Sequence, residues 1–423
     1  MPMWALCALG SIDLGRSAGS LHALPGYRER ERLLPQHNLS LPYPEGGHAK
    51  FLWVANHGSG FGWGNYMQEM VLNAYLAYAA RRAYVFDNYT WAREGPEISS
   101  FNGKLIPARI PLSALITGPI IGGSTGNKDV PRAVSREYFF SVCPESKRVV
   151  LDTRKIQNTL GEEATVSQIV ERWVEELNSI QSPCVELARD SPALFSYAIT
   201  NTKPVLDVYP ALSQSPILSD FGWSPLVLEG FYNNSKYFTD FAEPESPIET
   251  HTTPLNGLLV LHIRRGDYES WCNDAYKDGM SFTGFNSFPA LPNRYTPPNR
   301  HAAGSAAIAR QHCLPSIPEI LQKVLTVTEP HITRIYVMTN ASPSWLADLK
   351  RALGAAHHWP NGIATSRDLE LSWEGKFVSG AIDMHVGQRA DIFIGNGFSS
   401  LTSNIVMLRM HNPELKPSDI HFW

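Results

Sequence analysis

The feature that most constrains the fold is a short apolar run that ends in a glycine-rich loop and is followed by a helical pattern. The run covers residues 51–55 and the loop residues 58–64. Apolar residues then recur at helical spacing over residues 67–79, with Asn65 where an N-cap is expected. A second apolar run follows at residues 83–87. Strand, loop, helix and strand in this order make a βαβ unit, which predicts an α/β fold.

The second half of the chain alternates strands and helices in the same way. Residues 258–263 form an apolar run typical of a buried parallel strand, and the run at residues 391–394 leads into a helix at 400–410. Acidic residues and prolines cluster between Pro244 and Asn256, as in a linker. We therefore expect three parts: a poorly ordered leader (residues 1–48), an N-terminal α/β domain (49–245) and a C-terminal α/β domain (246–423).

Other segments complete this expected organisation. Apolar spacing predicts a helix at residues 164–180, whereas Gly-, Pro- and Ser-rich composition predicts long loops at 95–135 and an irregular insertion at 273–303. The remaining expected elements are helices near 317–327 and 343–353 and a strand at 334–338.

Composition and charge restrict the function classes. The chain has 423 residues, enough for two or three domains, and a net charge of -4 with 18% charged residues. Lys and Arg are dispersed, so we expect neither a nucleic-acid partner nor an anionic membrane surface. No window reaches the ~20 apolar residues of a membrane helix. The first ten residues make a poor signal peptide, so the protein is cytosolic or this start is incomplete.

The five cysteines include no C-x-x-C spacing, which argues against a zinc or thioredoxin-like site. Cys143–Cys184 and Cys272–Cys313 each fall within one expected domain, so we expect two disulfides and a free Cys7, with buried free thiols as the alternative. Four N-x-S/T sequons permit a secretory location. They lie at Asn38, Asn88, Asn233 and Asn340.

The strongest chemical signal is the run from His262 to Asp267, at the end of an expected parallel strand. Ligands of α/β proteins bind beyond the carboxyl ends of such strands. Because side chains alternate along a strand, we expect His262 and Arg264 on one face and Arg265 on the other. One arginine can then bind a diphosphate through its forked guanidinium while its neighbour braces the turn against Asp267. A purely structural Arg–Asp pair is the alternative.

A second signal lies where the strand at residues 391–394 turns through glycines into a helix that opens with hydroxyl side chains. The free N–H groups and the positive dipole of a helix N-terminus bind anions, so a phosphate would fit there. The alternative is that Ser399 or Ser400 simply caps the helix.

The glycine loop at residues 58–64 does not have the G-x-G-x-x-G spacing, and the chain has no P-loop motif. A nucleotide-sugar site or a plain tight turn is therefore favoured over a dinucleotide site, in which Asp87 would contact a ribose. The sequence also lacks D-x-D and H-E-x-x-H, so we expect no metal site. A bound diphosphate would be neutralised by arginine and helix amides.

Taken together, three motifs in this order resemble the GDP-fucose fucosyltransferase superfamily. They are the loop ending in Gly64-Asn65, His-x-Arg-Arg-x-Asp from His262, and Asp-x-Phe-Ile-Gly-Asn-x-x-Ser-Ser-x-Thr from Asp391. The resemblance spans about residues 50–410 and is closest to protein O-fucosyltransferase-like proteins, particularly fungal ones. It implies a GT-B fold, with two Rossmann-like domains facing across a donor-binding cleft and GDP-fucose held mainly by the C-terminal one. It also implies the lumen of the endoplasmic reticulum or Golgi.

The resemblance further implies roles for individual residues. Arg264 matches the arginine that stabilises the departing β-phosphate, and Asn65 matches a loop asparagine near the fucose; these two are the expected catalytic residues. His262 matches a histidine beside the donor, and Asp383 an acidic residue that recognises guanosine. The expected donor-binding residues are Gly62, Gly64, Asn65, His262, Arg264, Asp383, Phe398, Ser399, Ser400 and Thr402.

The implied reaction is inverting transfer of fucose from GDP-fucose to a Ser or Thr hydroxyl of a protein, without a metal or other cofactor. Such a reaction depends on charge stabilisation of the leaving diphosphate. Some relatives place a glutamate in the glycine loop as base, and this loop has none. The candidate bases are Glu69, Asp267, Glu269 and His57. Transfer to a glycan, or a catalytically silent relative that binds GDP-fucose or a glycan, are the alternatives.

Overall fold

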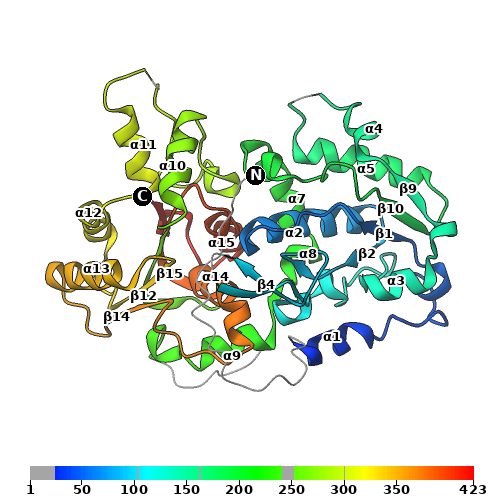
Figure 1. The fold of residues 1–423 in the computed structure, drawn as a ribbon, viewed down its shortest axis with the longest axis horizontal. Coiled ribbons are helices and arrows are strands. Elements are labelled where there is room, and N and C mark those ends of the chain that lie inside the picture. Colours follow the sequence, from blue (N-terminus) through cyan, green and yellow to red (C-terminus); the bar gives the residue numbers. More distant parts are fainter. Residues whose placement is uncertain (1–23, 102–103, 162, 241–251, 300) are drawn as a thin grey trace. The chain divides into compact units, whose positions relative to one another are not determined.

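The computed structural model describes residues 24–101, 104–161, 163–240, 252–299 and 301–423 (Figure 1). The chain forms two compact units, one containing Ser11–Leu226 and the other Val227–Trp423, and each is described by itself. Within the ranges just given, no helix combines the length and the apolar character that a membrane crossing requires.

The N-terminal unit is built on a parallel sheet of five short strands. Its first two strands enclose a 17-residue helix, α2 (Trp63–Ala79), so the βαβ unit expected at residues 51–87 is confirmed. Because α2 already begins at Trp63, its N-cap is Gly62, and the expected N-cap at Asn65 is wrong. In spatial order the strands are β8 (Val134–Ser135), β2 (Ala83–Phe86), β1 (Phe51–Val54), β10 (Cys184–Leu187) and β9 (Val149–Leu151).

Helix α5 (Val166–Ser179) confirms the helix expected at residues 164–180. Its start is fixed by a capping box, in which Thr165 and Gln168 each accept a hydrogen bond from the other's backbone N–H. The other helices of this unit are α1 (Pro25–Arg32), α3 (Arg136–Val142), α4 (Thr153–Gln157), α6 (Tyr197–Thr200), α7 (Tyr209–Ser213) and α8 (Pro216–Ser219).

The region expected to form long loops, residues 95–135, instead contributes several strands of two to four residues. Such strands are too short to show an alternating pattern, so the sequence gives no sign of them. They pair in small antiparallel sheets: β3 (Tyr89–Thr90) with β6 (Arg109–Ile110), β4 (Ile98–Phe101) with β5 (Lys104–Pro107), and β7 (Ile116–Thr117) with β11 (Gly222–Trp223).

The expected leader, residues 1–48, falls partly outside the described residues, which begin at Leu24. Its described part differs from a loosely held segment, because α1 is anchored to the unit. Glu31 on this helix is buried and accepts a hydrogen bond of 2.9 Å from the backbone N–H of Ser113.

The C-terminal unit also has a five-stranded parallel sheet, and it confirms the strands and helices expected from residue 258 onward. The strands in spatial order are β14 (Ile363–Thr365), β13 (Arg334–Thr339), β12 (Leu255–Ile263), β15 (Ala390–Gly395) and β16 (Ile420–Phe422). The helices are α10 (Tyr268–Lys277), α11 (Ser305–Cys313), α12 (Ile317–Val327), α13 (Pro343–Ala356), α14 (Ser379–Arg389) and α15 (Ser400–His411), and α9 (Pro225–Tyr232) leads into this unit.

Side chains on the two faces of the central strand β12 pack against different helices. Leu259, Leu261 and Ile263 are fully buried in a core formed with α12 and α13. His262, on the opposite face, meets α15 through Thr402. The pleat of β12 therefore decides which side chains reach the α15 side of the sheet.

Both expected disulfides are confirmed. Cys143–Cys184 lies in the N-terminal unit and Cys272–Cys313 in the C-terminal unit. Cys7, expected to be free, lies outside the described residues. So does most of the expected linker, including the domain boundary placed between residues 245 and 246, whereas the compact units divide between Leu226 and Val227.

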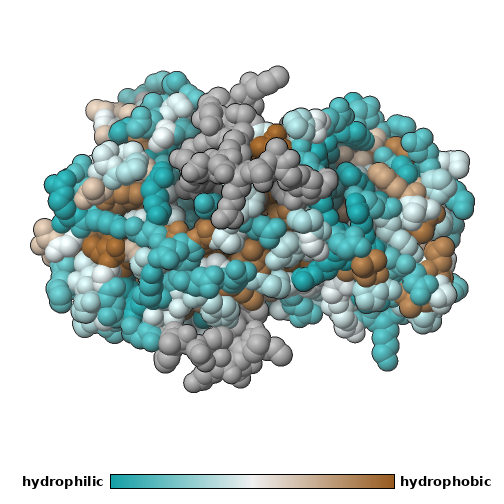
Figure 2. Space-filling view, turned by 60° about the horizontal axis from the view of Figure 1, so that its bottom comes forward, coloured by the Kyte–Doolittle hydropathy of each residue, from teal (hydrophilic) through white to brown (hydrophobic). Residues whose placement is uncertain are grey.

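The surface gives no single dominant apolar patch on the face drawn in Figure 2, where hydrophobic residues appear as small separate areas among hydrophilic ones. The most exposed large apolar side chain of the described residues is Leu33, at 70%, followed by Tyr43, Leu39 and Val150.

Candidate functional site

Except for Asp383, the expected donor residues of the C-terminal unit lie at one edge of its sheet, where the parallel strands β12 and β15 end. Arg264 directly follows β12, and its side chain is only 5% exposed. Its Nη2 donates to both carboxylate oxygens of Asp267, at 2.7 and 3.0 Å, and its guanidinium lies 4.4 Å from the centre of the Tyr268 ring. Arg264 is thus held as a buried cation on the first turn of α10.

Arg265 occupies a different environment, on the α13 side of the sheet. Its guanidinium donates to the carbonyl oxygens of Arg264 and Pro315 and lies 4.2 Å from the centre of the Trp345 ring. The expected division of His262 and Arg265 between the two faces is therefore confirmed. The arginine that pairs with Asp267 is Arg264, however, so the expectation that the second arginine braces this turn is wrong.

His262 is fully buried beside Arg264. Its Nδ1 lies 2.6 Å from the Oγ1 of Thr402, which joins the end of β12 to the first turn of α15. Burial and, secondarily, the charge of Arg264 lower the pKa of His262 to about 3, so its imidazole is neutral at physiological pH. Among the described residues, no group hydrogen-bonds to its buried Nε2.

The N-terminus of α15 has the backbone arrangement of an anion site. Ser399 is the N-cap in extended conformation, yet its side chain makes no capping hydrogen bond. The alternative in which Ser399 caps this helix is therefore excluded for this structure. Ser399 is buried and Ser400 is half-buried. The first N–H groups of a 12-residue helix are consequently not satisfied by that side chain.

The loop before α15 is held by the insertion that follows α10, a contribution the sequence does not reveal. Asn286 donates from Nδ2 to the carbonyl oxygens of Gly397 and Ser399, at 2.9 and 3.2 Å. The ring of Phe282 packs so closely that a Cβ at position 397 would lie 2.4 Å from it, which only glycine allows. Asn286 and Phe282 belong to no recognisable sequence motif, because they act through contacts with residues more than 100 positions away in the chain.

Phe398 is buried in the same loop. Its carbonyl oxygen accepts a hydrogen bond of 3.3 Å from the hydroxyl of Tyr268, and its ring makes an edge contact with Trp271, 5.9 Å between centres. The start of α10 and the loop before α15 are therefore packed together, which brings the turn of Arg264 and the start of α15 into one site.

Asp383 lies on α14 and is buried. Its carboxylate accepts hydrogen bonds from the hydroxyl of Tyr336, at 2.6 Å, and from Ser366, at 2.9 and 3.0 Å. Burial raises the pKa of Asp383 to about 6 against the lowering effect of these bonds. The guanosine role expected for Asp383 stays a prediction.

In the N-terminal unit, the glycine loop leads into α2 as expected. Gly62 is the N-cap, and Gly64 and Asn65 lie in the first turn of the helix. The Oδ1 atom of Asn65 is buried, with no hydrogen-bond partner among the described residues. A ligand donor would satisfy this oxygen.

Glu69 secures the start of the glycine loop. Its carboxylate accepts hydrogen bonds of 3.1 and 2.9 Å from the backbone N–H of Gly58. Burial raises the pKa of Glu69 to about 7, although the bond from Gly58 lowers it. A carboxyl group with such a pKa is able to accept a proton near neutral pH.

The other candidate bases differ in their surroundings. The carboxylate of Asp267 forms an ion pair with Arg264, and Glu269 is exposed. His57 has Nδ1 3.1 Å from the carbonyl oxygen of Gly58 and Nε2 3.4 Å from the carboxylate of Asp87. Burial alone would raise the pKa of Asp87, but the bond from His57 and the charge of Arg136 lower it to about 2. Asp87, considered for a ribose contact, is thus bound within its own unit.

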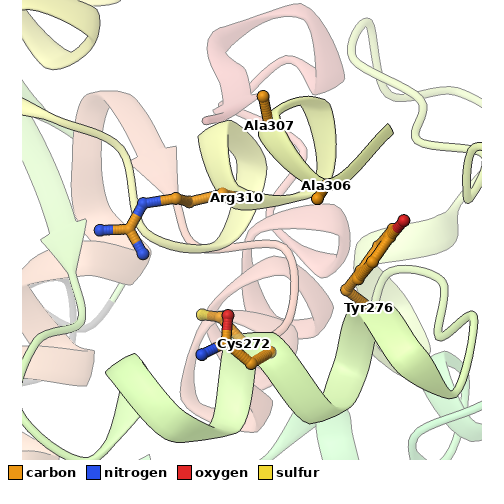
Figure 3. A pocket seen from close by; sticks show the side chains of 6 residues that line it. Cys272, Tyr276, Ala306, Ala307 and Arg310 are labelled. Carbon is orange, nitrogen blue, oxygen red and sulfur yellow. The ribbon is translucent and has the colours of Figure 1, made fainter. Parts of the chain in front are cut away.

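Among the described residues, no group of three or more His, Cys, Asp or Glu side chains is arranged to hold a metal ion. A pocket of about 170 Å³ opens between α10 and α11, beside Cys272 (Figure 3). Tyr276 and Arg310 flank it at opposite ends. It borders the helix that starts at the Arg264 turn, but none of the expected donor residues lines it.

Comparison with known proteins shows which family the C-terminal part of the chain resembles. Residues 235–412 match the sequence profile described as GDP-fucose protein O-fucosyltransferase. This part of the chain is therefore similar to that family. The matched range contains the Arg264 turn, Asp383 and the start of α15. In a sequence search of curated proteins, no protein matches significantly.

Solved structures extend the similarity to nearly the whole chain. The crystal structure of POFUT1 in complex with GDP-fucose is 13% identical with a TM-score of 0.54, and the match covers 88% of this chain and 98% of that one. The apo form of POFUT1 is 15% identical with a TM-score of 0.53, covering 88% and 97%. NodZ fucosyltransferase from Bradyrhizobium is 11% identical with a TM-score of 0.39, covering 84% and 92%. The chain therefore has the α/β fold of GT-B type.

Proposed function

We propose that this protein is a GDP-fucose-dependent fucosyltransferase that transfers fucose, with inversion, to a Ser or Thr hydroxyl of a protein. The observation that carries the proposal is the arrangement at the edge of the C-terminal sheet. A buried arginine, a neutral histidine with an unsatisfied Nε2 and the N-terminus of α15 converge there. These groups suit a nucleoside diphosphate sugar, and the family profile covers all of them.

In the proposed complex, the N–H groups of the first turn of α15 and the hydroxyls of Ser399 and Ser400 bind the diphosphate. The neutral imidazole of His262 offers one hydrogen bond through Nε2, while Thr402 fixes the orientation of the ring. Arg264 contributes the positive charge that opposes the charge growing on the β-phosphate. These donors support the proposal that neutralisation of the diphosphate needs no metal.

The proposed reaction breaks the bond between C1 of fucose and the β-phosphate oxygen, and both electrons of that bond leave with GDP. The acceptor hydroxyl oxygen forms the new bond to C1 from the opposite side, and its proton passes to a base or to solvent. The raised pKa of Glu69 suits such a base, so we propose Glu69 rather than the other three candidates.

We also propose Asn65, with Gly62 and Gly64, as part of the donor-binding residues. The buried and unsatisfied Oδ1 of Asn65 supports this proposal, because a buried acceptor without a donor gains most from a ligand hydroxyl. Asp383 is proposed to contact guanosine through the part of its carboxylate that Tyr336 and Ser366 leave unused.

The test is incubation with labelled GDP-fucose and a library of folded protein domains and glycans, with the Arg264→Ala variant as control. Label released as an O-linked sugar from Ser or Thr supports the proposal. Label on a glycan would assign the protein to glycan fucosylation. GDP-fucose binding without transfer to any acceptor would identify a silent relative.

We propose that the protein works in the lumen of the endoplasmic reticulum or Golgi. Two disulfides fit an oxidising compartment. Among the sequons, Asn38 and Asn233 are exposed and able to carry a glycan, whereas Asn88 is buried with its Nδ2 donating to Asp87. Peptide mapping after enzymatic deglycosylation tests this. We expect modification at Asn38 and Asn233, and a protein without any glycan would contradict the proposed location.

A further inference from the structure

The side chain of Asn340 closes the turn that carries Arg264. Strands β12 and β13 run parallel with Ile263 opposite Thr339, so the next residues, Arg264 and Asn340, leave the sheet side by side. The Oδ1 of Asn340 accepts a hydrogen bond of 2.8 Å from the backbone N–H of Arg265. Its Nδ2 donates to the carbonyl oxygen of Arg265 and to Oδ1 of Asp267, both at 2.8 Å.

These bonds use both hydrogens of the Asn340 amide, one for the backbone of the turn and one for Asp267. The same Oδ1 of Asp267 also accepts from Nη2 of Arg264, at 3.0 Å. Asn340 thereby fixes the carboxylate that in turn fixes the guanidinium. The chain reverses at Gly266, directly before Asp267, with a φ of +63° that strongly favours glycine.

We propose that Asn340 is a positioning residue for Arg264: it acts on the donor site only through Asp267 and the turn, and touches no reacting atom. This inference rests on the proposed function, in which Arg264 stabilises the leaving phosphate. It has a second consequence for the sequon Asn340-Ala341-Ser342. An N-linked sugar would replace one of the two Nδ2 hydrogens that hold the turn, so the folded enzyme keeps Asn340 unmodified.

A double-mutant cycle tests the positioning role. The readouts are hydrolysis of GDP-fucose, in which water replaces the acceptor and no acceptor need be known, and calorimetric binding of GDP. Asn340→Ala is expected to lower kcat for hydrolysis roughly 10- to 100-fold, with a smaller change in KM, because misplacement of a catalytic group costs about this much. In the Arg264→Ala background the same change is expected to have almost no further effect on kcat.

A merely structural asparagine would behave differently. Its loss would lower the melting temperature and the active fraction, and kcat would fall by the same factor in both backgrounds. That additive result would overturn the inference. The melting temperature and the GDP-binding stoichiometry of each variant separate a loss of folded protein from a loss of rate.

Two further variants define which atoms matter. Asn340→Asp keeps the shape but removes both donors and sets a second carboxylate against Asp267, so it is expected to be at least as slow as Asn340→Ala. In the double variant with Asp267→Asn, the amide at position 267 donates to the carboxylate at position 340, the reverse of the wild-type bond. This variant is expected to recover part of the lost rate. No recovery at all would contradict the proposed bond.

Ser342→Asp is the matched control. It destroys the sequon but keeps an oxygen able to accept the N–H of Trp345, as Ser342 does at the N-cap of α13. We expect unchanged kcat and unchanged mass, and a glycan lost from Asn340 in this variant would refute the second consequence. If the wild-type protein binds GDP but never hydrolyses or transfers fucose, the proposed function fails instead. The cycle then remains readable in the dissociation constants for GDP.

Discussion

Alanine at Arg265 is expected to destabilise the protein strongly while leaving the chemistry at the α15 side of the sheet in place. The change removes two hydrogen bonds from a charged donor to the carbonyl oxygens of Arg264 and Pro315, and a cation–π contact with Trp345. Hydrogen bonds of this kind contribute ~1.5–3 kcal/mol each and a cation–π contact ~0.5–2 kcal/mol. Because such effects are not additive, a loss of about 4 kcal/mol is a reasonable expectation.

For a unit of this size, each 1 kcal/mol changes the melting temperature by roughly 2–4 °C, so Arg265→Ala is expected to melt about 8–16 °C lower. Arg264→Ala should show the opposite balance. It leaves Asp267 bound to Asn340 and removes the cation from the proposed donor site. Loss of one stabilising donor at a developing charge lowers the rate by ~10²–10³.

The assay compares kcat for GDP-fucose turnover with the melting temperature in both variants, using active sites counted by GDP binding. Arg264→Lys serves as a further control, because it keeps the charge but not the fork and should recover little rate. A folded Arg264→Ala protein with near wild-type turnover would show that Arg264 is only the structural partner of Asp267, and would refute the catalytic assignment.

Three other measurements test separate parts of the site. Changing Ser399 and Ser400 together to alanine should weaken GDP binding without lowering the melting temperature, because the side chain of Ser399 makes no capping hydrogen bond. Excess EDTA should leave the GDP-induced rise in melting temperature unchanged, because the proposed site needs no metal. Burial raises the pKa of Glu69 from 4.5 to about 7, so the folded protein keeps a proton that the unfolded chain releases. The contribution of this group to the free energy of unfolding therefore falls as the pH rises from 4.5 to about 7. Glu69→Gln removes the titrating group, so the melting temperature should depend less on pH in this range. An unchanged pH dependence would assign the effect to other groups. Replacing Cys272 and Cys313 by serine opens a loop of 41 residues, and we expect a loss of about 4 kcal/mol in chemical denaturation; a loss near zero would mean that packing alone orders the insertion.

The parts of the fold that the sequence predicts are those with a local signal. Strand β12 is a continuous apolar run, and α5 repeats its apolar residues every three or four positions, so both are recognised within a short window. The N-cap of α2 shows the limit of such signals. Asn65 is a good capping residue, but the N-cap lies three residues earlier, at Gly62, which adopts the required extended backbone, and the helix begins at Trp63.

The candidate site was predictable only where its residues follow directly on strands. His262, Arg264 and Thr402 stand at strand and helix ends, which the motif positions reveal. Asn286 and Asn340 act from distant segments through single side chains, and neither lies in a recognisable pattern. In the sequence, Asn340 is recognisable only as part of a sequon, whereas in the structure its amide holds the turn of Arg264. Side-chain hydrogen bonds between distant segments follow no sequence period, so this role could not be predicted.

The two adjacent arginines owe their different roles to the pleat of β12 rather than to their own chemistry. Leu261 and Ile263 point into the core with α12 and α13, so the residues between and after them, His262 and Arg264, are directed away from that core. Sliding the strand by one position would turn His262 and Arg264 toward α13 and expose apolar side chains to α15. The apolar core that stabilises the sheet therefore also selects which guanidinium lies on the α15 side. If that side holds the proposed donor site, a variant that keeps the Arg-Arg pair but shortens β12 by one residue should lose activity despite retaining every motif residue.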